Sequence, residues 1–163
     1  MENCIKLKKD ETLKLEIVTS DGKSTGEYLE FFLEDIELPL RFQELIEKDK
    51  KAREYLRNEI TIIDKRQDVK GKKLLSKNEE DKIRALNDFF KREIEVYNMF
   101  LGENGVEKLL HGRKMGWTTL QEIDEIIEKQ IAPKLDLSMT KITDKIKAKY
   151  SQSVDKEEIE VLD

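Results

Sequence analysis

The stretch that decides the fold is residues 78–102, NEEDKIRALNDFFKREIEVYNMFLG. Its apolar side chains recur at spacings of three and four, which places them on one face of an α-helix: Ile83, Leu86, Phe90, Ile94, Tyr97 and Leu101. Asn78 is a favourable N-cap residue, and the acidic residues after it suit the positive end of the helix dipole. Gly102 stands where a helix C-cap is expected. The sequence therefore predicts one well-bounded amphipathic helix.

A second amphipathic helix is predicted upstream, from residue 40 to about residue 65, after Pro39, which suits the first turn of a helix. Its apolar stripe comprises Phe42, Leu45, Ile46, Ala52, Leu56, Ile60 and Ile63. The link of residues 64–77 contains Gly71 and six Lys or Arg against two Asp, a local charge of +4. Two long helices joined by such a link predict an αα-hairpin over residues 39–102.

The first 34 residues have the pattern of β-strands. Apolar and charged residues alternate from Leu13 to Ile17, which is the period of a half-buried strand. The Asp-Gly pair at residues 21–22 is a strong turn signal, and the aromatic run at residues 27–33 fits a second strand. We therefore expect a small antiparallel β-hairpin within residues 1–34, which residues 5–7 could extend by a third strand.

Shorter helices are predicted over residues 105–150. The first of them contains Val106, Leu109 and Leu110. A capping-box pattern at residues 119–122 begins the next helix, which ends near Pro133. A last helix is expected over residues 138–150, and the acidic residues 151–163 are expected to form a disordered tail.

Length and composition favour a single domain over residues 1–150 that is mainly α, with a small N-terminal antiparallel β element, an α+β class. Charged residues make up 41% of the chain, against about 25% in a typical domain, which favours long helices with solvated faces. No run approaches the roughly 18–20 apolar residues of a membrane span, and the N-terminus has no signal-like apolar region. The net charge of −5 argues against general nucleic-acid binding. We expect a cytoplasmic protein.

Candidates for catalysis or metal binding are few. Cys4 and His111 are the only cysteine and histidine, so a disulfide within the chain and a thiolate-rich metal site are not expected. His111 fits a surface or C-cap position at the end of a short helix. Asp124 and Glu128 are one helical turn apart and could bind a cation, but their place opposite an isoleucine stripe favours a solvated face. We expect no catalytic residue, no metal and no cofactor.

Residues 78–102 carry more apolar side chains than one stripe needs. Phe89, Met99 and Phe100 lie off the main stripe, so they are either buried under the C-terminal helices or available to another chain. If they contact another chain, the candidate contact residues are Phe89, Met99, Phe100, Val106, Leu110 and Trp117.

Residues 31–68 and 89–131 resemble the tail assembly chaperones of long-tailed phages and prophages of Gram-positive bacteria. The shared features are an aromatic strand leading into Leu-Pro, a charged helix ending in Ile-Asp-Lys-Arg, and above all LGENGVEKLL at residues 101–110. The resemblance implies a non-enzymatic protein of the bacterial host's cytoplasm, absent from the mature virion. It also implies that the chain binds the tape-measure protein and promotes assembly of the tail-tube protein. From the net charge and the lack of a long apolar run, we expect neither nucleic acid nor membrane as a partner.

Two other functions stay open. One is a structural or adaptor protein of a phage particle that acts by homo-oligomerisation through the helical hairpin. The other is a small regulator that binds a basic host protein through its acidic surface.

Overall fold

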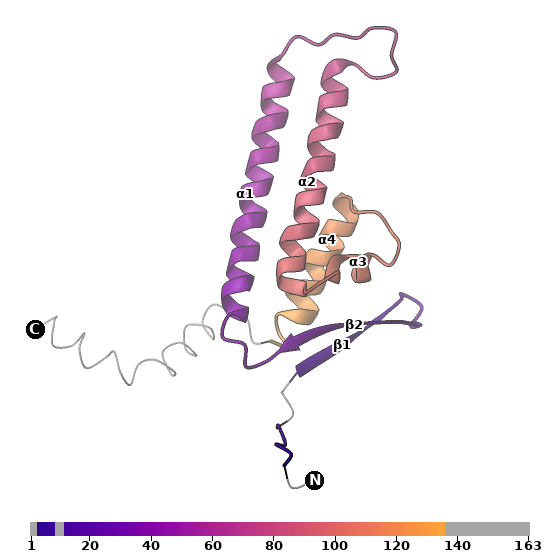
Figure 1. Ribbon diagram of the computed structural model, residues 1–163. Coiled ribbons are helices and arrows are strands. Elements are labelled where there is room, and N and C mark those ends of the chain that lie inside the picture. Colours follow the sequence, from indigo (N-terminus) through magenta and orange to yellow (C-terminus); the bar gives the residue numbers. More distant parts are fainter. Residues whose placement is uncertain (1–2, 9–11, 136–163) are drawn as a thin grey trace, which may run out of the picture. The chain divides into compact units, whose positions relative to one another are not determined.

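The computed structural model describes residues 3–8 and 12–135, and the chain divides into two compact units, residues 1–120 and residues 121–163 (Figure 1). The first unit holds two strands, a pair of long helices, a short helix and the start of a fourth helix. The α+β class is confirmed. The helix expected over residues 138–150 and the tail of residues 151–163 lie outside the described residues, and the single domain over residues 1–150 stays a prediction.

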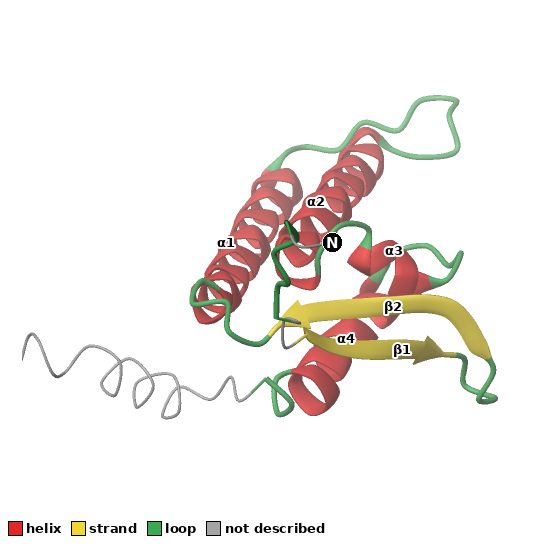
Figure 2. Cartoon of the chain, turned by 60° about the horizontal axis from the view of Figure 1, so that its bottom comes forward, coloured by secondary structure: helices red, strands yellow, loops and turns green. Residues whose placement is uncertain are grey.

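The β-hairpin forms as the alternation of residues predicts. β1 (Thr12–Val18) pairs antiparallel with β2 (Ser24–Phe32), and Leu15 lies opposite Leu29 in the register. Leu29 and Phe31 are buried on one face, while the other face combines charged residues such as Lys14 and Glu30 with the exposed Phe32. β2 is the strand next to the short helix α3, as Figure 2 shows. The third strand suggested around residues 5–7 does not form, and Ile5 and Leu7 are almost fully exposed.

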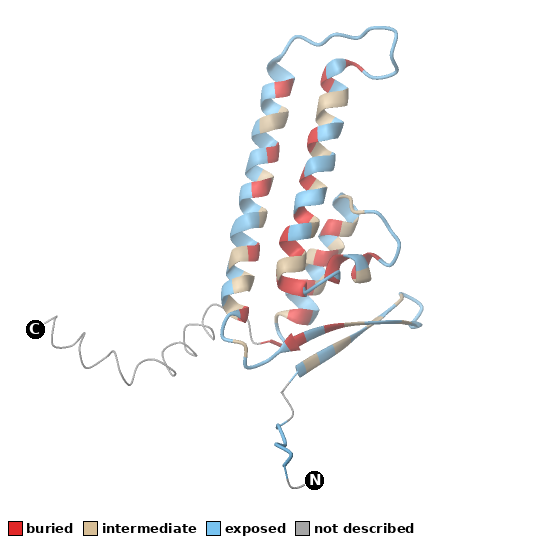
Figure 3. Cartoon of the chain, in the orientation of Figure 1, coloured by how far each residue is buried: buried red, intermediate tan, exposed pale blue. Residues whose placement is uncertain are grey.

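The long helices form the predicted αα-hairpin. α1 (Leu38–Lys65) begins two residues earlier than expected, with Pro39 in its first turn, and α2 (Lys77–Leu101) packs against it. Figure 3 shows buried residues along the facing sides of the two helices. The buried residues of α1 are Leu38, Leu45, Ala52, Leu56 and Ile63. The predicted burial of Ile46 is wrong, since its side chain is 52% exposed.

The buried face of α2 differs from the predicted stripe. The residues that it buries beside α1 and β2 recur mostly at spacings of four, at Ala85, Phe89, Glu93, Val96 and Phe100. The Phe100 ring lies 5.6 Å from that of Phe31 on β2 and 5.3 Å from that of Phe42 on α1, so it joins three elements. Tyr97 and Leu101 of the predicted stripe are buried as well, but Ile83 is exposed. α2 is thus apolar on two adjacent faces, and α1 covers only one of them.

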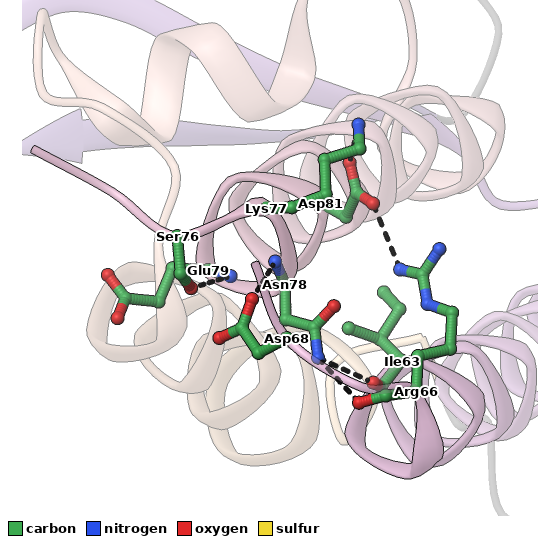
Figure 4. A network of polar contacts seen from close by, with 8 residues as sticks. All are labelled: Ile63, Arg66, Asp68, Ser76, Lys77, Asn78, Glu79 and Asp81. Atoms are coloured by element: carbon green, nitrogen blue, oxygen red, sulfur yellow. Dashed lines mark hydrogen bonds and ion pairs between the residues drawn. The ribbon is translucent and has the colours of Figure 1, made fainter. Parts of the chain in front are cut away.

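A polar network joins the ends of the two long helices (Figure 4). The N-cap of α2 is Ser76, whose hydroxyl accepts a 3.1 Å hydrogen bond from the Glu79 amide. The prediction that Asn78 is the N-cap is therefore wrong. Its side-chain nitrogen instead donates to the carbonyls of Ile63 and Arg66, at 3.0 and 3.1 Å. Asn78 lies beside the end of α1, where unpaired carbonyls need donors, and so acts as a clamp between the helices.

The turn after α2 forms as predicted, with Gly102 in a positive-φ conformation at the C-cap. α3 (Gly105–Leu110) follows, and the Asn98 side chain on α2 accepts a 2.8 Å hydrogen bond from the Val106 amide at its start. A Cβ on Gly105 would lie 2.5 Å from the Cβ of Leu101, so only glycine allows the two helices to approach this closely.

α4 (Trp117–Ile126) begins two residues before the predicted capping box. The Thr119 hydroxyl does not cap from the N-cap position; it lies in the first turn and accepts a 2.7 Å hydrogen bond from the Gly116 amide. A π-helical turn, Ile127–Ile131, continues the helix towards Pro133. Among the described residues of the second unit, residues 121–135, the buried ones are Ile123, Ile127, Ile131 and Leu135.

Candidate protein-binding surface

The six predicted contact residues fall into two groups. Four are buried within the chain, and they are Phe89, Phe100, Val106 and Leu110. Met99 is half-buried, with its sulfur 3.6 Å from the Lys48 ammonium on α1, and Trp117 is 50% exposed. Contact with a partner stays a prediction for all six, and only Trp117 and Met99 already offer surface to one.

Trp117 is held on an aromatic base. Its ring centre lies 5.3 Å from that of Phe89 and 5.1 Å from that of Phe90, and the two phenylalanine rings are 5.3 Å apart. Such tilted and edge-to-face contacts stabilise aromatic groups beyond the area that they bury. A large side chain that is both exposed and held in place loses little conformational freedom on binding, which is typical of residues that dominate interfaces.

The apolar surface continues from Trp117 along α2. Phe90 and Leu86 are half-buried, and Ile83 is 52% exposed. Spacings of four and three place these α2 residues on one face of the helix. We call Ile83, Leu86, Phe90 and Trp117 the α2 strip. Sequence reasoning found the α2 members as a stripe but assigned them to the core, and only the number of apolar residues on α2 signalled a second face.

Charge around the α2 strip differs between its two ends. The turn of residues 111–116, next to Trp117, contains Arg113 and Lys114 and no acid, and Lys91 follows Phe90 on α2. The Arg113 side chain is positioned by hydrogen bonds to the carbonyls of Leu109 and Leu110. Lys91 and Lys114 are both exposed, so they give this end of the strip positive charge.

The Ile83 end of the α2 strip is close to neutral. Glu80 forms a 2.7 Å ion pair with Arg84, and hydrogen bonding from Arg84 lowers the pKa of the Glu80 carboxyl. Glu79 adds an exposed negative charge at the start of α2. The strip thus presents an apolar line with a positive end and a neutral to slightly negative end.

The catalytic candidates of the sequence do not gather in a site. Cys4 is exposed, and His111 is an exposed C-cap of α3 in a left-handed conformation, which agrees with the predicted surface or C-cap position. A groove of about 340 Å³ between α1 and α2 is lined by Ile62, Arg66 and Asp81 among others. Hydrogen bonds from Lys77, then Arg66, lower the pKa of Asp81, so its carboxylate is engaged in the hairpin network.

Within the described part of the chain, no three His, Cys, Asp or Glu side chains come together as a metal site requires. None of the described helices combines the length and apolarity needed to cross a bilayer. Comparison of the chain with protein-family models, with curated proteins and with solved structures gives no match.

Proposed function

We propose that the chain is a non-enzymatic phage tail assembly chaperone that binds the tape-measure protein and promotes assembly of the tail-tube protein in the cytoplasm of the bacterial host. The observation that carries the proposal is the α2 strip, an apolar line on an exposed helix face with Trp117 fixed at one end. A tape-measure protein is a long helical chain, and amphipathic helices bind to apolar surfaces of this shape. The resemblance of residues 101–110 to the chaperone family supports the same function.

The proposal is tested by capturing the tagged chain from cells that are assembling phage tails and identifying its partners by mass spectrometry. The expected result is enrichment of a very long helical protein and of a tube subunit, with the chain missing from purified particles. Recovery of neither protein, or stoichiometric amounts of the chain in mature particles, would overturn the proposal.

A structural protein that acts by homo-oligomerisation is the second candidate. The sequence suggested the helical hairpin as its contact surface, and the edge of the sheet offers a further one. β1 pairs only with β2 among the described residues, so its outer edge offers backbone groups to another strand. Sedimentation of the purified chain distinguishes the two functions. A stable ring or stack that is also present in particles would favour the structural protein, and a monomer or small oligomer the chaperone.

A further inference from the structure

We propose that the α2 strip is the docking surface for a single amphipathic α-helix of a partner protein, and that this helix carries acidic residues at the end that meets Trp117. The inference rests on the proposed function, because it names the surface and the chemistry by which a helical partner is held. It adds Ile83, Leu86 and Phe90 to the binding surface as residues that no motif in the sequence assigns to it.

The shape of the strip fits one helix. Seven residues separate Ile83 from Phe90, which is about 10 Å along α2, and the Trp117 ring lies 5.1 Å from that of Phe90. Two to three turns of a partner helix therefore cover it, with apolar residues three, four and seven apart on the contact face. Side chains exposed along one helix face do not enclose a small molecule, which needs a concave site.

Charge decides what kind of helix fits. The exposed Lys91 and Lys114 flank the Trp117 end, so acidic residues on the partner would be attracted there and basic residues repelled. The basic segment of this chain at residues 138–150 has four lysines against one aspartate, so it carries the wrong charge to be the occupant. An acidic helix from another protein has the complementary charge.

The test uses the full chain and the fluorescence of Trp117, which is the only tryptophan. Two synthetic stapled helices of about 18 residues share one leucine stripe and differ only in whether Glu or Lys flanks it at one end. The Glu helix is expected to shift Trp117 emission to shorter wavelength, to protect it from acrylamide, and to bind about tenfold more tightly than the Lys helix at low salt. Equal affinity of the two helices, or no change in Trp117 emission with either, would overturn the inference.

Matched variants locate the contact on α2. Ile83→Glu places a charge in the strip, while Ile46→Glu places the same charge on α1 at a side chain with the same exposure of 52%. Because both side chains are exposed, both variants are expected to fold, which circular dichroism checks. Ile83→Glu is expected to weaken binding of the Glu helix at least about tenfold, and Ile46→Glu to leave it unchanged. Equal binding by the two variants would overturn the inference.

Two further outcomes assign the α2 strip to a different occupant. Protection of Trp117 that grows with protein concentration, without any added helix, assigns it to a second copy of the chain. Acrylamide quenching that rises when Glu157, Glu158 and Glu160 are replaced by Gln assigns it to the chain's own acidic segment. Either result overturns the inference.

Failure of the inference is distinguishable from failure of the proposed function. The synthetic helices need no phage protein, so a chain that binds the Glu helix but captures no tape-measure protein from cells keeps the inference and loses the function. If the chain captures the tape-measure protein and Ile83→Glu captures the same amount, the proposed function is kept and the inference about the α2 strip is lost.

Discussion

Asn78 provides the sharpest test of how the helical hairpin is held together. Its side chain donates two hydrogen bonds, to the carbonyls of Ile63 and Arg66 at the end of α1. A neutral hydrogen bond contributes about 0.5–1.5 kcal/mol, so the pair would contribute about 1–3 kcal/mol. The Ile63 carbonyl also accepts from the Arg66 amide, and Arg66 is exposed, so Asn78→Ala leaves neither carbonyl without a partner or water. We therefore expect a loss of about 1–2 kcal/mol in the free energy of unfolding.

The measurement is urea unfolding followed by circular dichroism, with Asn87→Ala as the matched control. Asn87 is an exposed asparagine in the same helix, so its replacement reports the gain in helix propensity alone. The difference between the two variants gives the contribution of the clamp. A difference below about 0.5 kcal/mol would refute it, since that is within the range of ordinary surface substitutions.

Asn78→Asp separates the clamp from an N-cap. Asparagine and aspartate cap helices about equally well, so an N-cap at this position would tolerate the change. The clamp would not, because an ionised carboxylate has no proton to donate and would face two carbonyl oxygens. We expect Asn78→Asp to be less stable than Asn78→Ala at neutral pH, and wild-type stability for Asn78→Asp would contradict the structure.

Three further predictions concern single residues. Ser76→Ala removes the N-cap of α2 and is expected to lower the free energy of unfolding by about 1 kcal/mol in the same urea assay, and no change would argue against that cap. Gly105→Ala is expected to lower the free energy of unfolding by about 1–3 kcal/mol, because the new Cβ would clash with the preceding helix. The control is Gly71→Ala, whose Cβ would meet no atom within 4 Å. Equal losses for the two variants would contradict the close approach of the helices at Gly105. The lowered pKa of Asp81, caused first by its hydrogen bond from Lys77, stabilises the fold above the unfolded pKa of about 4, and this contribution is lost as pH falls through the lower folded value. Thermal unfolding from pH 6 to pH 2 should therefore show a smaller loss of stability at acid pH for Asp81→Asn than for wild type. Identical profiles of the two proteins would refute a contribution of Asp81 to acid stability.

Periodicity predicted the elements correctly where one face alone had to be buried. The alternation in β1 and the stripe on α1 each have a single buried side, so the pattern identifies the element and most of its core. Ile46 shows the limit of this reasoning, because it lies at the margin of the stripe and only the position of α2 decides its exposure.

The sequence pattern alone does not determine which residues of α2 are buried. It has two adjacent apolar faces, and periodicity cannot tell which of them meets α1, so Ile83 was assigned to the core while Phe89 was set apart from it. The prediction of Asn78 as the N-cap was wrong for a related reason. Its local sequence fits an N-cap, and its actual partners lie 12 and 15 residues earlier, where only the folded hairpin brings them near.

The candidate site could be predicted only in part. Trp117 was identified from residue type, but the rings that support it lie on another helix, and its neighbours along the α2 strip were hidden among expected core residues. The four contact candidates that the structure buries share their residue types with exposed interface residues, so composition alone could not separate the two groups.

Binding of the tape-measure protein through the α2 strip is tested by quantitative capture of that protein from tail-assembling cells with three tagged forms of the chain: wild type, Ile83→Glu and Ile46→Glu. We expect wild type and Ile46→Glu to recover the same amount, and Ile83→Glu to recover at least about tenfold less while remaining folded. Equal recovery by all three forms, or no tape-measure protein with the wild-type chain, would contradict it.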